Sequence, residues 1–362
     1  VSLLNDPMYL GWRHERITGQ AYDDFIDAFV TAITKKFPSL YLHWEDFGRG
    51  HARQILERYR NQICTINGDM QATGAIALAC VLAGAKASGL PLPEHRIVIM
   101  GAGTAGVGIA DNIRQALMRQ GLSEKAALAR FYLVDKDGLL TTASDLLPFQ
   151  QAYARPIQEI NQWQDVNKNH ISLLDVVKNV KPTILIGCST ATGAFTEEIV
   201  HIMAEHVKRP IIMPLSNPTT LAEATPKDLI RWTKGQAIIA TVSPFDDVHY
   251  RKKTFRIAQS NNAFAFPGIG LGVCAVKAKR LSDDMIAAAT IALSECSPSN
   301  QDPYAPLLPK LSEARMVSYN VAIAVAEQAR QEGLAQVADN VDLKKLIATN
   351  MWEPHYYPYR KL

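Results

Sequence analysis

The sequence predicts an α/β protein in which a doubly wound parallel sheet is inserted in a mainly helical domain. From Arg96 to Val242 short apolar runs alternate with helical patterns, as expected for βαβ units in a parallel sheet. A glycine-rich turn leads directly from the first of these runs into a helix. Before and after this region the apolar residues follow helical spacing, as in YDDFIDAFVTAITKKF at 21–36 and RMVSYNVAIAVAEQARQEG at 315–333.

Five apolar runs are expected to form the strands of the sheet. They are HRIVIM at 95–100, FYLVD at 131–135, PTILIG at 182–187, RPIIMPL at 209–215 and QAIIATV at 236–242. The intervals between them leave room for crossover helices, so the strands can run parallel. Outside the sheet we expect a strand at 40–44 and further helices at about 51–62, 70–87 and 285–296. The final segment, MWEPHYYPYRKL, contains too many aromatic residues and prolines for a helix.

The composition is that of a globular chain and excludes several classes of protein. A length of 362 residues with 48% hydrophobic and 20% charged residues allows two domains. The net charge of +3 and the lack of a basic tract predict no nucleic-acid or membrane partner. The apolar runs are expected to be too short to span a bilayer. Five scattered cysteines without CxxC spacing, and no signal-peptide pattern, favour a cytoplasmic protein.

The turn GAGTAG at 101–106 is the strongest motif in the sequence. Gly101 permits a tight turn, Gly103 lets the backbone approach a pyrophosphate, and Gly106 allows close helix packing. The start of the helix, with Thr104 and Ala105, offers N–H groups to phosphates. In this strand–turn–helix setting the pattern indicates a Rossmann-like dinucleotide site. The alternative is a structural glycine turn without a cofactor.

Asp135 ends the next predicted strand and suits the hydroxyl groups of a ribose. It follows Gly106 by 29 residues, so the intervening helix and loop must be long. A carboxylate there would repel a 2′-phosphate, which favours NAD over NADP, although Lys136 weakens this preference.

Ligands of open α/β sheets bind at the carboxyl ends of the strands. Those ends carry Ser189 and Asn217, and Asn217 before Pro218 is equally typical of a plain turn. Asn261 and Asn262 lie where the alternating region ends. Two adjacent amides there suggest polar recognition at a domain boundary, with a turn as the alternative.

Three carboxylates could form a site for Mg²⁺ or Mn²⁺ if they converged, because these ions prefer oxygen ligands. Glu45 and Asp46 end a predicted strand, and Asp69 precedes a helix. A solvated strand end and a helix N-cap are the simpler interpretations, and for Asp69 alone the cap is favoured. Cys188 lies near the predicted cofactor site, but no base is paired with it, so we expect no nucleophilic role.

Six segments, in this order, resemble the malic enzymes, most closely the large bacterial NAD-dependent type. They are HWEDFG, YRNQICTINGDMQATGA, GAGTAGVGIA, RPIIMPLSNPT, TVSPF and AQSNNAFAFPGIGLG. The resemblance covers nearly the whole chain. It implies oxidative decarboxylation of L-malate to pyruvate and CO2, with NAD and a divalent cation, Mg²⁺ or Mn²⁺. We also expect a homo-oligomer, either a dimer or a tetramer.

The resemblance assigns roles to individual residues and divides the chain. The metal ligands would be Glu45, Asp46 and Asp69, and the substrate side would comprise Asn217 and Asn262. The expected cofactor residues are Thr73, Gly101, Gly103, Thr104, Ala105, Gly106, Asp135, Ser189, Asn217 and Asn261. Residues 1–68 and 262–335 would form the substrate and metal domain, residues 69–261 the NAD domain, and residues 336–362 a C-terminal tail.

The chain departs from the family pattern in two places. The family's Tyr acid, Lys base and substrate-binding Arg lie in an N-terminal portion that has no counterpart here, and the first residue is Val1. We therefore expect these 362 residues to bind NAD but to turn over malate poorly or not at all. Gly68 stands where the family usually has an Asp that holds the Lys. In a protein of full family length, Gly68→Asp is expected to raise malate turnover.

Two rival functions share these motifs. Malolactic enzyme releases lactate and retains its NAD, but SPF at 243–245 and AQSNN at 258–262 resemble the malic type more. A non-catalytic NAD-binding protein would bind NAD without Mn²⁺-dependent binding of malate.

Overall fold

The computed structural model describes residues 3–164, 166–167 and 170–361. The chain forms two compact units, Val1–Tyr41 and Leu42–Leu362. The first unit contains a short 3-10 helix, η1 (Leu3–Asn5), and helix α1 (Gln20–Lys36). Ile26 and Val30 are buried on α1, whereas Phe25 is 59% exposed. The domain boundaries expected at 68/69, 261/262 and 335/336 all fall within the second unit and stay a prediction.

A seven-stranded sheet with the order β11-β8-β7-β6-β3-β4-β5 organises the second unit. Its strands are β3 (Ile97–Met100), β4 (Phe131–Asp135), β5 (Gly138–Leu139), β6 (Ile184–Gly187), β7 (Ile211–Pro214), β8 (Ile238–Thr241) and β11 (Ala258–Gln259). Neighbours pair in parallel except for β4 and β5, which are antiparallel. The doubly wound parallel sheet is therefore confirmed, and the five predicted runs are its β3, β4, β6, β7 and β8. Strands β5 and β11 were not predicted, because two residues leave no periodic pattern.

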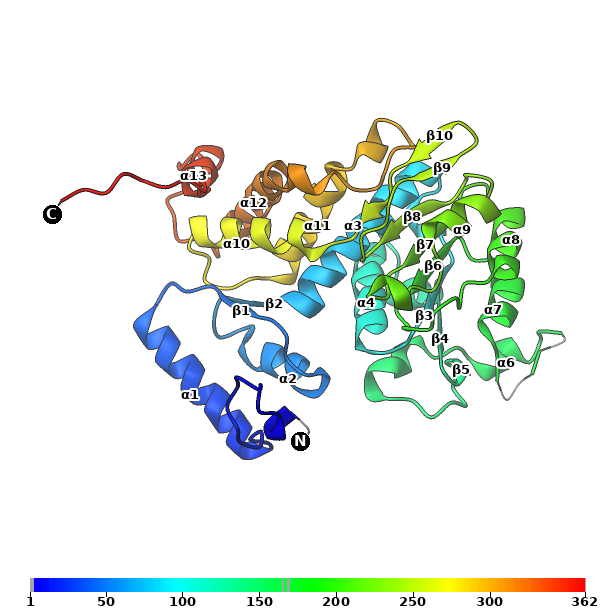
Figure 1. The fold of residues 1–362 in the computed structure, drawn as a ribbon, viewed down its shortest axis with the longest axis horizontal. Coiled ribbons are helices and arrows are strands. Elements are labelled where there is room, and N and C mark those ends of the chain that lie inside the picture. Colours follow the sequence, from blue (N-terminus) through cyan, green and yellow to red (C-terminus); the bar gives the residue numbers. More distant parts are fainter. Residues whose placement is uncertain (1–2, 165, 168–169, 362) are drawn as a thin grey trace. The chain divides into compact units, whose positions relative to one another are not determined.

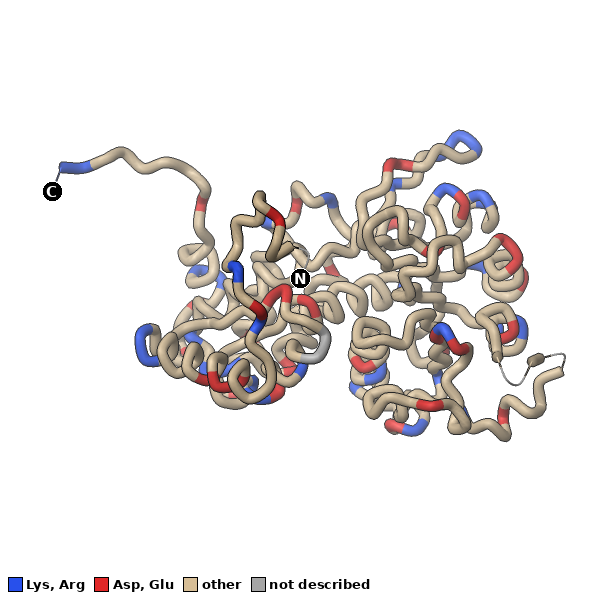
Figure 2. Tube along the Cα trace, turned by 60° about the horizontal axis from the view of Figure 1, so that its bottom comes forward, with Lys and Arg blue, Asp and Glu red and all other residues tan. Residues whose placement is uncertain are grey.

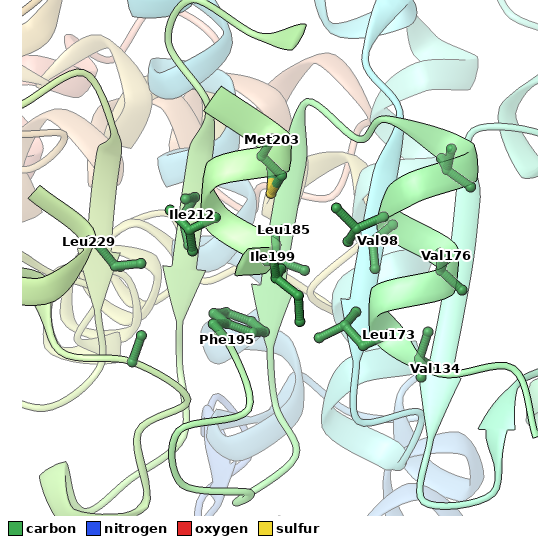
Figure 3. Close-up of a cluster of buried hydrophobic side chains, with 14 of the residues drawn as sticks. Val98, Val134, Leu173, Val176, Leu185, Phe195, Ile199, Met203, Ile212 and Leu229 are labelled. Carbon is green, nitrogen blue, oxygen red and sulfur yellow. The ribbon is translucent and has the colours of Figure 1, made fainter. Parts of the chain in front are cut away.

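Helices cover both faces of this sheet (Figure 1). On one face lie α7 (Leu173–Val180), α8 (Glu197–His206) and α9 (Pro226–Trp232). Figure 3 shows how Val98, Leu185 and Ile212 from β3, β6 and β7 pack against side chains of these helices. On the other face lie α3 (Thr73–Ser88) and α4 (Thr104–Arg119). Gly84 of α3 lies directly over Ile211, where a Cβ atom would meet the Ile211 side chain at 3.1 Å.

A helical layer packs against α3 on the side away from the sheet (Figure 1). It consists of α10 (Phe266–Ala275), α11 (Asp283–Glu295) and α12 (Ala314–Gln331), with α13 (Leu343–Asn350) against α12. Gly268 and Gly272, one turn apart on α10, allow close packing on α12. A Cβ atom on Gly272 would lie 2.7 Å from the carbonyl oxygen of Ala322. The predicted helices at 285–296 and 315–333 are confirmed as α11 and α12.

The segment Gly68–Ser88 is long and apolar enough to cross a membrane by length and composition. The expectation that every apolar run is too short is therefore wrong for this segment. However, 72% of its apolar stretch is buried inside the structure, between α4, α11 and the sheet. It is thus a core helix of this fold.

The remaining elements of the second unit are short. Strands β1 (Leu42–Trp44) and β2 (Thr65–Asn67) form a parallel pair, and β9 (Val248–Tyr250) pairs with β10 (Lys253–Phe255) as a hairpin. The helices are α2 (Arg49–Tyr59), α5 (Glu124–Leu128) and α6 (Ile157–Ile160). The aromatic end of the chain contains no helix after Asn350 within the described residues, as predicted. Basic and acidic residues are interspersed along the described trace in Figure 2.

Candidate functional site

A cavity of about 700 Å³ reaches from the carboxyl ends of β3, β4 and β6 into the space between helices α2, α3, α4 and α11. The chain leaves β3 toward β4 on one side and returns to β6 on the other, so the strand order reverses between β3 and β6. Such a switch point is where doubly wound sheets bind ligands. Eight residues singled out from the sequence line the cavity: Asp69, Thr73, Gly101, Gly103, Thr104, Ala105, Asp135 and Ser189.

The three glycines of the turn between β3 and α4 occupy three different environments. Gly101 has φ +99°, and a Cβ atom there would lie 2.4 Å from the backbone of Cys188. Gly103 faces open space, with no atom within 4 Å of an added Cβ. Gly106 is buried against the turn, because its Cβ would lie 1.9 Å from the carbonyl oxygen of Gly101. The tight turn, open approach and close packing expected of these residues are all present, and they fit a pyrophosphate.

Asp135 lies at the end of β4 and lines the cavity. Its Oδ1 accepts the N–H of Lys136 at 2.9 Å, and its Oδ2 lies 3.5 Å from Nε2 of Gln150. The same Nε2 donates to the carbonyl oxygen of Ala102 at 2.8 Å. Gln150 is buried and therefore ties the acidic residue to the glycine turn. Gln150 lies in no recognisable sequence motif, and its contacts with Ala102 and Asp135 emerge only from the fold.

Helices α4 and α5 fill the long interval between Gly106 and Asp135. Helix α4 begins at the cavity, since Gly103, Thr104 and Ala105 line it. This arrangement offers a positive dipole end to a phosphate and a carboxylate to a ribose.

Another part of the cavity wall comes from the residues that follow β6. Ser189 and Thr190 line it, and both are held by a buried network around Glu223 and Ser216. Glu223 carries no local sequence pattern that marks it for this site. Cys188 also lines this wall, and burial followed by the Glu223 charge raises the pKa of its thiol to about 12. A neutral thiol is a poor nucleophile, so the expectation of no nucleophilic role stands.

Glu45, Asp46 and Asp69, the predicted metal ligands, all lie near the end of the β1–β2 pair. Because Trp44 is in register with Asn67, Glu45 and Asp46 leave β1 beside the start of the next helix. The N–H of Asp46 donates to Oδ2 of Asp69 at 2.9 Å. The Glu45 carboxylate instead lies 2.7 Å from Nε2 of His43.

The three carboxylates have the right chemistry for a divalent cation, but in this structure they are not positioned around a common point. Three carboxylates supply the oxygen ligands that Mg²⁺ and Mn²⁺ prefer. Among the described residues, however, no three His, Cys, Asp or Glu side chains gather closely enough to hold an ion. Glu45, Asp46 and Asp69 as metal ligands therefore stay a prediction.

Asp69 does not cap the following helix, so that simpler interpretation is wrong. The π-helical turn η2 (Gly68–Ala72) leads into α3, and its N-cap is Asn67, whose side chain accepts the N–H of Met70 at 2.9 Å. The Asp69 carboxylate is thereby free to reach the Asp46 amide. Gly68 precedes Asp69 and has no side chain. The Glu45 carboxylate occupies the position that a side chain at residue 68 would take.

The three asparagines lie outside the cavity lining. Asn217 is exposed and joined to Pro218 by a cis peptide bond. The Asn261 side chain accepts the N–H of Ala263 at 2.9 Å and caps the 3-10 helix η6 (Asn262–Phe264). Asn262 is half-buried. Asn261 thus has a structural role, and the assignments of Asn217, Asn261 and Asn262 to cofactor or substrate stay predictions.

Comparison with known proteins identifies two matching families and many relatives. Residues 70–330 match the family described as "Malic enzyme, NAD binding domain", and residues 1–60 match "Malic enzyme, N-terminal domain". A Bacillus subtilis protein named "NAD-dependent malic enzyme 3" is 51% identical over 363 residues, which is 100% of this chain and 64% of that protein. An NAD-dependent malic enzyme of Shewanella frigidimarina is 47% identical, over 99% of this chain and 64% of its own length.

Solved structures show the same fold. The malic enzyme of Pyrococcus horikoshii superposes with a TM-score of 0.70 at 25% identity, covering 93% of this chain and 70% of that one. The Entamoeba histolytica malic enzyme also gives a TM-score of 0.70, at 22% identity, over 91% of this chain and 62% of that one. The chain therefore spans about two thirds of the length of the proteins it matches.

Proposed function

The chain belongs to the malic enzyme family, and from that premise we propose that it carries the NAD-binding and metal-binding parts of an L-malate-oxidising enzyme. The reaction is the oxidative decarboxylation of L-malate to pyruvate and CO2, with reduction of NAD. The observation that carries the proposal is the 700 Å³ cavity, which is lined by the glycine turn and opens at the β3–β6 switch point.

Each part of the cavity would meet a different part of NAD. The N–H groups at the start of α4 would bind the pyrophosphate beside Gly103, where the backbone is open. Asp135 would accept hydroxyl groups of the adenosine ribose and disfavour a 2′-phosphate. Because β6 and β7 lie on the opposite side of β3 from β4, Ser189 would face the nicotinamide half.

The carboxylates near the β1–β2 end would hold the cation. When bound, NAD supplies the hydride acceptor and a divalent cation supplies positive charge that stabilises the enolate. Asp69 lies at the border of the two groups, because it lines the cavity and also contacts Asp46. Asn217 and Asn262 are proposed to orient the substrate. The chain would then bind both NAD and the cation.

Calorimetry with malate tests this proposal. L-malate is titrated into the chain saturated with NAD, with and without Mn²⁺. We expect malate to bind only with Mn²⁺, and Asp69→Asn to remove that binding. Asp339→Asn, which changes an exposed acid far along the chain, is the matched control. Binding of NAD without any Mn²⁺-dependent binding of malate would instead identify a non-catalytic NAD-binding protein.

Product analysis separates the proposed reaction from its nearest alternative. Any turnover of malate with NAD and Mn²⁺ is expected to release pyruvate and NADH. Release of lactate without net NADH would overturn the proposal in favour of malolactic chemistry.

We further propose that the chain works in the cytoplasm as a homo-oligomer, a dimer or a tetramer. The aromatic end supports association, since Trp352 is 71% exposed and Tyr356 and Tyr359 are fully exposed. Exposed aromatic groups of this size commonly mark a protein contact. All five cysteines are free, as expected in a reducing compartment. Light scattering of the intact chain tests the oligomeric state, and a monomer would contradict it.

A further inference from the structure

Glu223 is a fully buried carboxylate that the proposed reaction leaves without a role. Its side chain has 0% relative exposure. Within the described residues no Lys, Arg or His forms an ion pair with it. Burying a carboxylate is costly unless hydrogen bonds replace its water. The structure must therefore provide donors for it.

Two serines from adjacent strand ends provide those donors. Oε1 of Glu223 accepts the N–H of Ser189 at 2.9 Å and its hydroxyl at 2.8 Å. The same oxygen accepts the hydroxyl of Ser216 at 2.6 Å, while Oε2 lies 3.4 Å from the Ser216 nitrogen. Ser189 follows β6 and Ser216 follows β7. One carboxylate therefore ties the carboxyl ends of two neighbouring strands together.

The hydrogen bonds continue into the cavity wall with a fixed direction. The Ser216 hydroxyl, which donates to Glu223, accepts the N–H of Thr190 at 2.8 Å. The Ser189 hydroxyl likewise donates to Glu223 and accepts the N–H of Ala191 at 3.2 Å. Each hydroxyl thus passes one hydrogen bond from a backbone amide to the carboxylate. Only a group that accepts at both oxygens satisfies the whole network.

The backbone of β6 leaves a space that fits this carboxylate. Gly187 is the last residue of β6, and a Cβ atom there would lie 2.4 Å from Cδ of Glu223. The segment held by Glu223 also supports the glycine turn, since a Cβ on Gly101 would lie 2.7 Å from the Ser189 nitrogen. Glu223 is consequently connected to both sides of the switch point through Ser189.

We propose that Glu223 is a positioning residue that ties the loop after β6 to the end of β7 and so fixes the β6 loop as the wall for the nicotinamide half of NAD. This inference rests on the proposed function, because it assigns the β6–β7 side of the cavity to nicotinamide. It predicts that loss of the carboxylate impairs recognition of the nicotinamide half, while the adenosine diphosphate half, held near Gly103 and Asp135, binds as before.

Calorimetry with NAD and with ADP tests the proposal. Glu223→Gln keeps the size of the side chain but places an amide nitrogen against the Ser216 N–H. Losing charge-assisted hydrogen bonds of this kind is expected to raise the Kd for NAD by about tenfold, with the Kd for ADP within about twofold of the original chain. Ser216→Ala, which removes the link to Thr190 without changing the acid, should have the same selective effect. Glu205→Gln on the exposed face of α8 is the matched control.

The outcomes separate failure of this inference from failure of the proposed function. If the unchanged chain binds ADP but not NAD, or neither, the proposed function fails. If it binds both and the two variants bind NAD as tightly as the unchanged chain does, the inference is overturned. Equal weakening of NAD and ADP, with a lower melting temperature, would also overturn it by showing a purely structural role. A selective loss for NAD in Ser216→Ala supports it even if Glu223→Gln does not fold.

Discussion

Gly101 and Gly103 are separated by one residue, but replacing each with alanine should affect different properties, stability at Gly101 and NAD binding at Gly103. Gly101→Ala places a methyl group 2.4 Å from the Cys188 backbone at φ +99°, and we expect a loss of stability of about 2 kcal/mol or more. Gly103→Ala meets no atom within 4 Å, so its cost is limited to a poorer N-cap for α4, about 0.5–1 kcal/mol. Its methyl group would instead occupy the approach of the pyrophosphate and weaken NAD binding. Thermal unfolding and NAD titration of both variants measure this, and an unchanged NAD affinity in Gly103→Ala would contradict it.

Gly68 is the residue at which the chain leaves its family pattern, and the structure adds a physical cost to restoring the acid. A Cβ atom at 68 would lie 1.8 Å from Oε2 of Glu45 and 2.4 Å from Nε2 of His43. Gly68→Asp must therefore displace Glu45 from His43 and add a like charge. We expect a loss of about 1 kcal/mol, kept small because Glu45 is partly exposed and can rotate away. Gly68→Ala separates the steric effect from the charge, and a higher melting temperature for Gly68→Asp would refute the expectation.

The site residues that the sequence indicated are those with a local pattern. The three glycines and Asp135 were predicted from the spacing of strand, turn and helix, and the backbone has that spacing. Gln150 and Glu223 act through contacts with residues 48 and 34 positions away in the chain, with Ala102 and Ser189 respectively. Tertiary packing brings such partners together, so no local sequence pattern predicts them. The same reason applies to Asp69. Asn67 is the N-cap of the helical turn, and the Asp69 carboxylate accepts the N–H of Asp46 instead.

At the scale of elements, the contact between α10 and α12 depends on glycine. We expect Gly272→Ala to lose about 1–3 kcal/mol of stability, because its methyl group would meet the Ala322 carbonyl at 2.7 Å and the backbone must move. Gly108→Ala in α4 is the matched control, since no atom lies within 4 Å of its Cβ, and it should gain about 0.5–1 kcal/mol. Urea unfolding of both variants tests the pair. Equal changes in the free energy of unfolding would contradict this, because they would show that the α10–α12 contact accommodates a methyl group at residue 272.

Elements with long periodic patterns were predictable, and short ones were not. The five central strands are continuous apolar runs, and helices α3, α4, α11 and α12 are long apolar or amphipathic segments. The hairpin β9–β10 and strands β5 and β11 have only two or three residues each. Their pairing is decided by the edge of the sheet and by the turn at Arg251 and Lys252, which both have positive φ. Neither influence is visible in apolar spacing.

For the whole molecule, buried His95 predicts how stability depends on pH. The ring is 1% exposed, donates from Nε2 to the Leu90 carbonyl and lies 2.8 Å from the Thr183 hydroxyl. Burial, with a smaller contribution from the Arg96 charge, lowers its pKa to about 4, although the bond to Leu90 opposes this. The unfolded chain therefore binds one more proton between the unfolded pKa of about 6.5 and the folded pKa. The stabilisation is complete above pH 6.5 and is lost as the pH falls toward 4.

The slope of stability against pH checks this account. Between pH 6.5 and 4 the free energy of unfolding should fall by at most about 1.4 kcal/mol per pH unit on account of His95. His95→Gln should be less stable at neutral pH but should flatten that slope. His206→Gln, at the end of α8, is the control. Parallel pH profiles for His95→Gln and the unchanged chain would contradict a neutral buried ring.

We propose that the carboxyl edge of the sheet binds NAD, and direct calorimetric titration of the chain with NAD tests this. We expect saturable binding of one NAD per chain, weakened in Gly103→Ala while that variant stays folded. We also expect stronger binding of NAD than of NADP, because the Asp135 carboxylate would repel a 2′-phosphate. A folded chain that shows no binding of NAD at millimolar concentration, or that binds NAD equally well after Gly103→Ala, would contradict it.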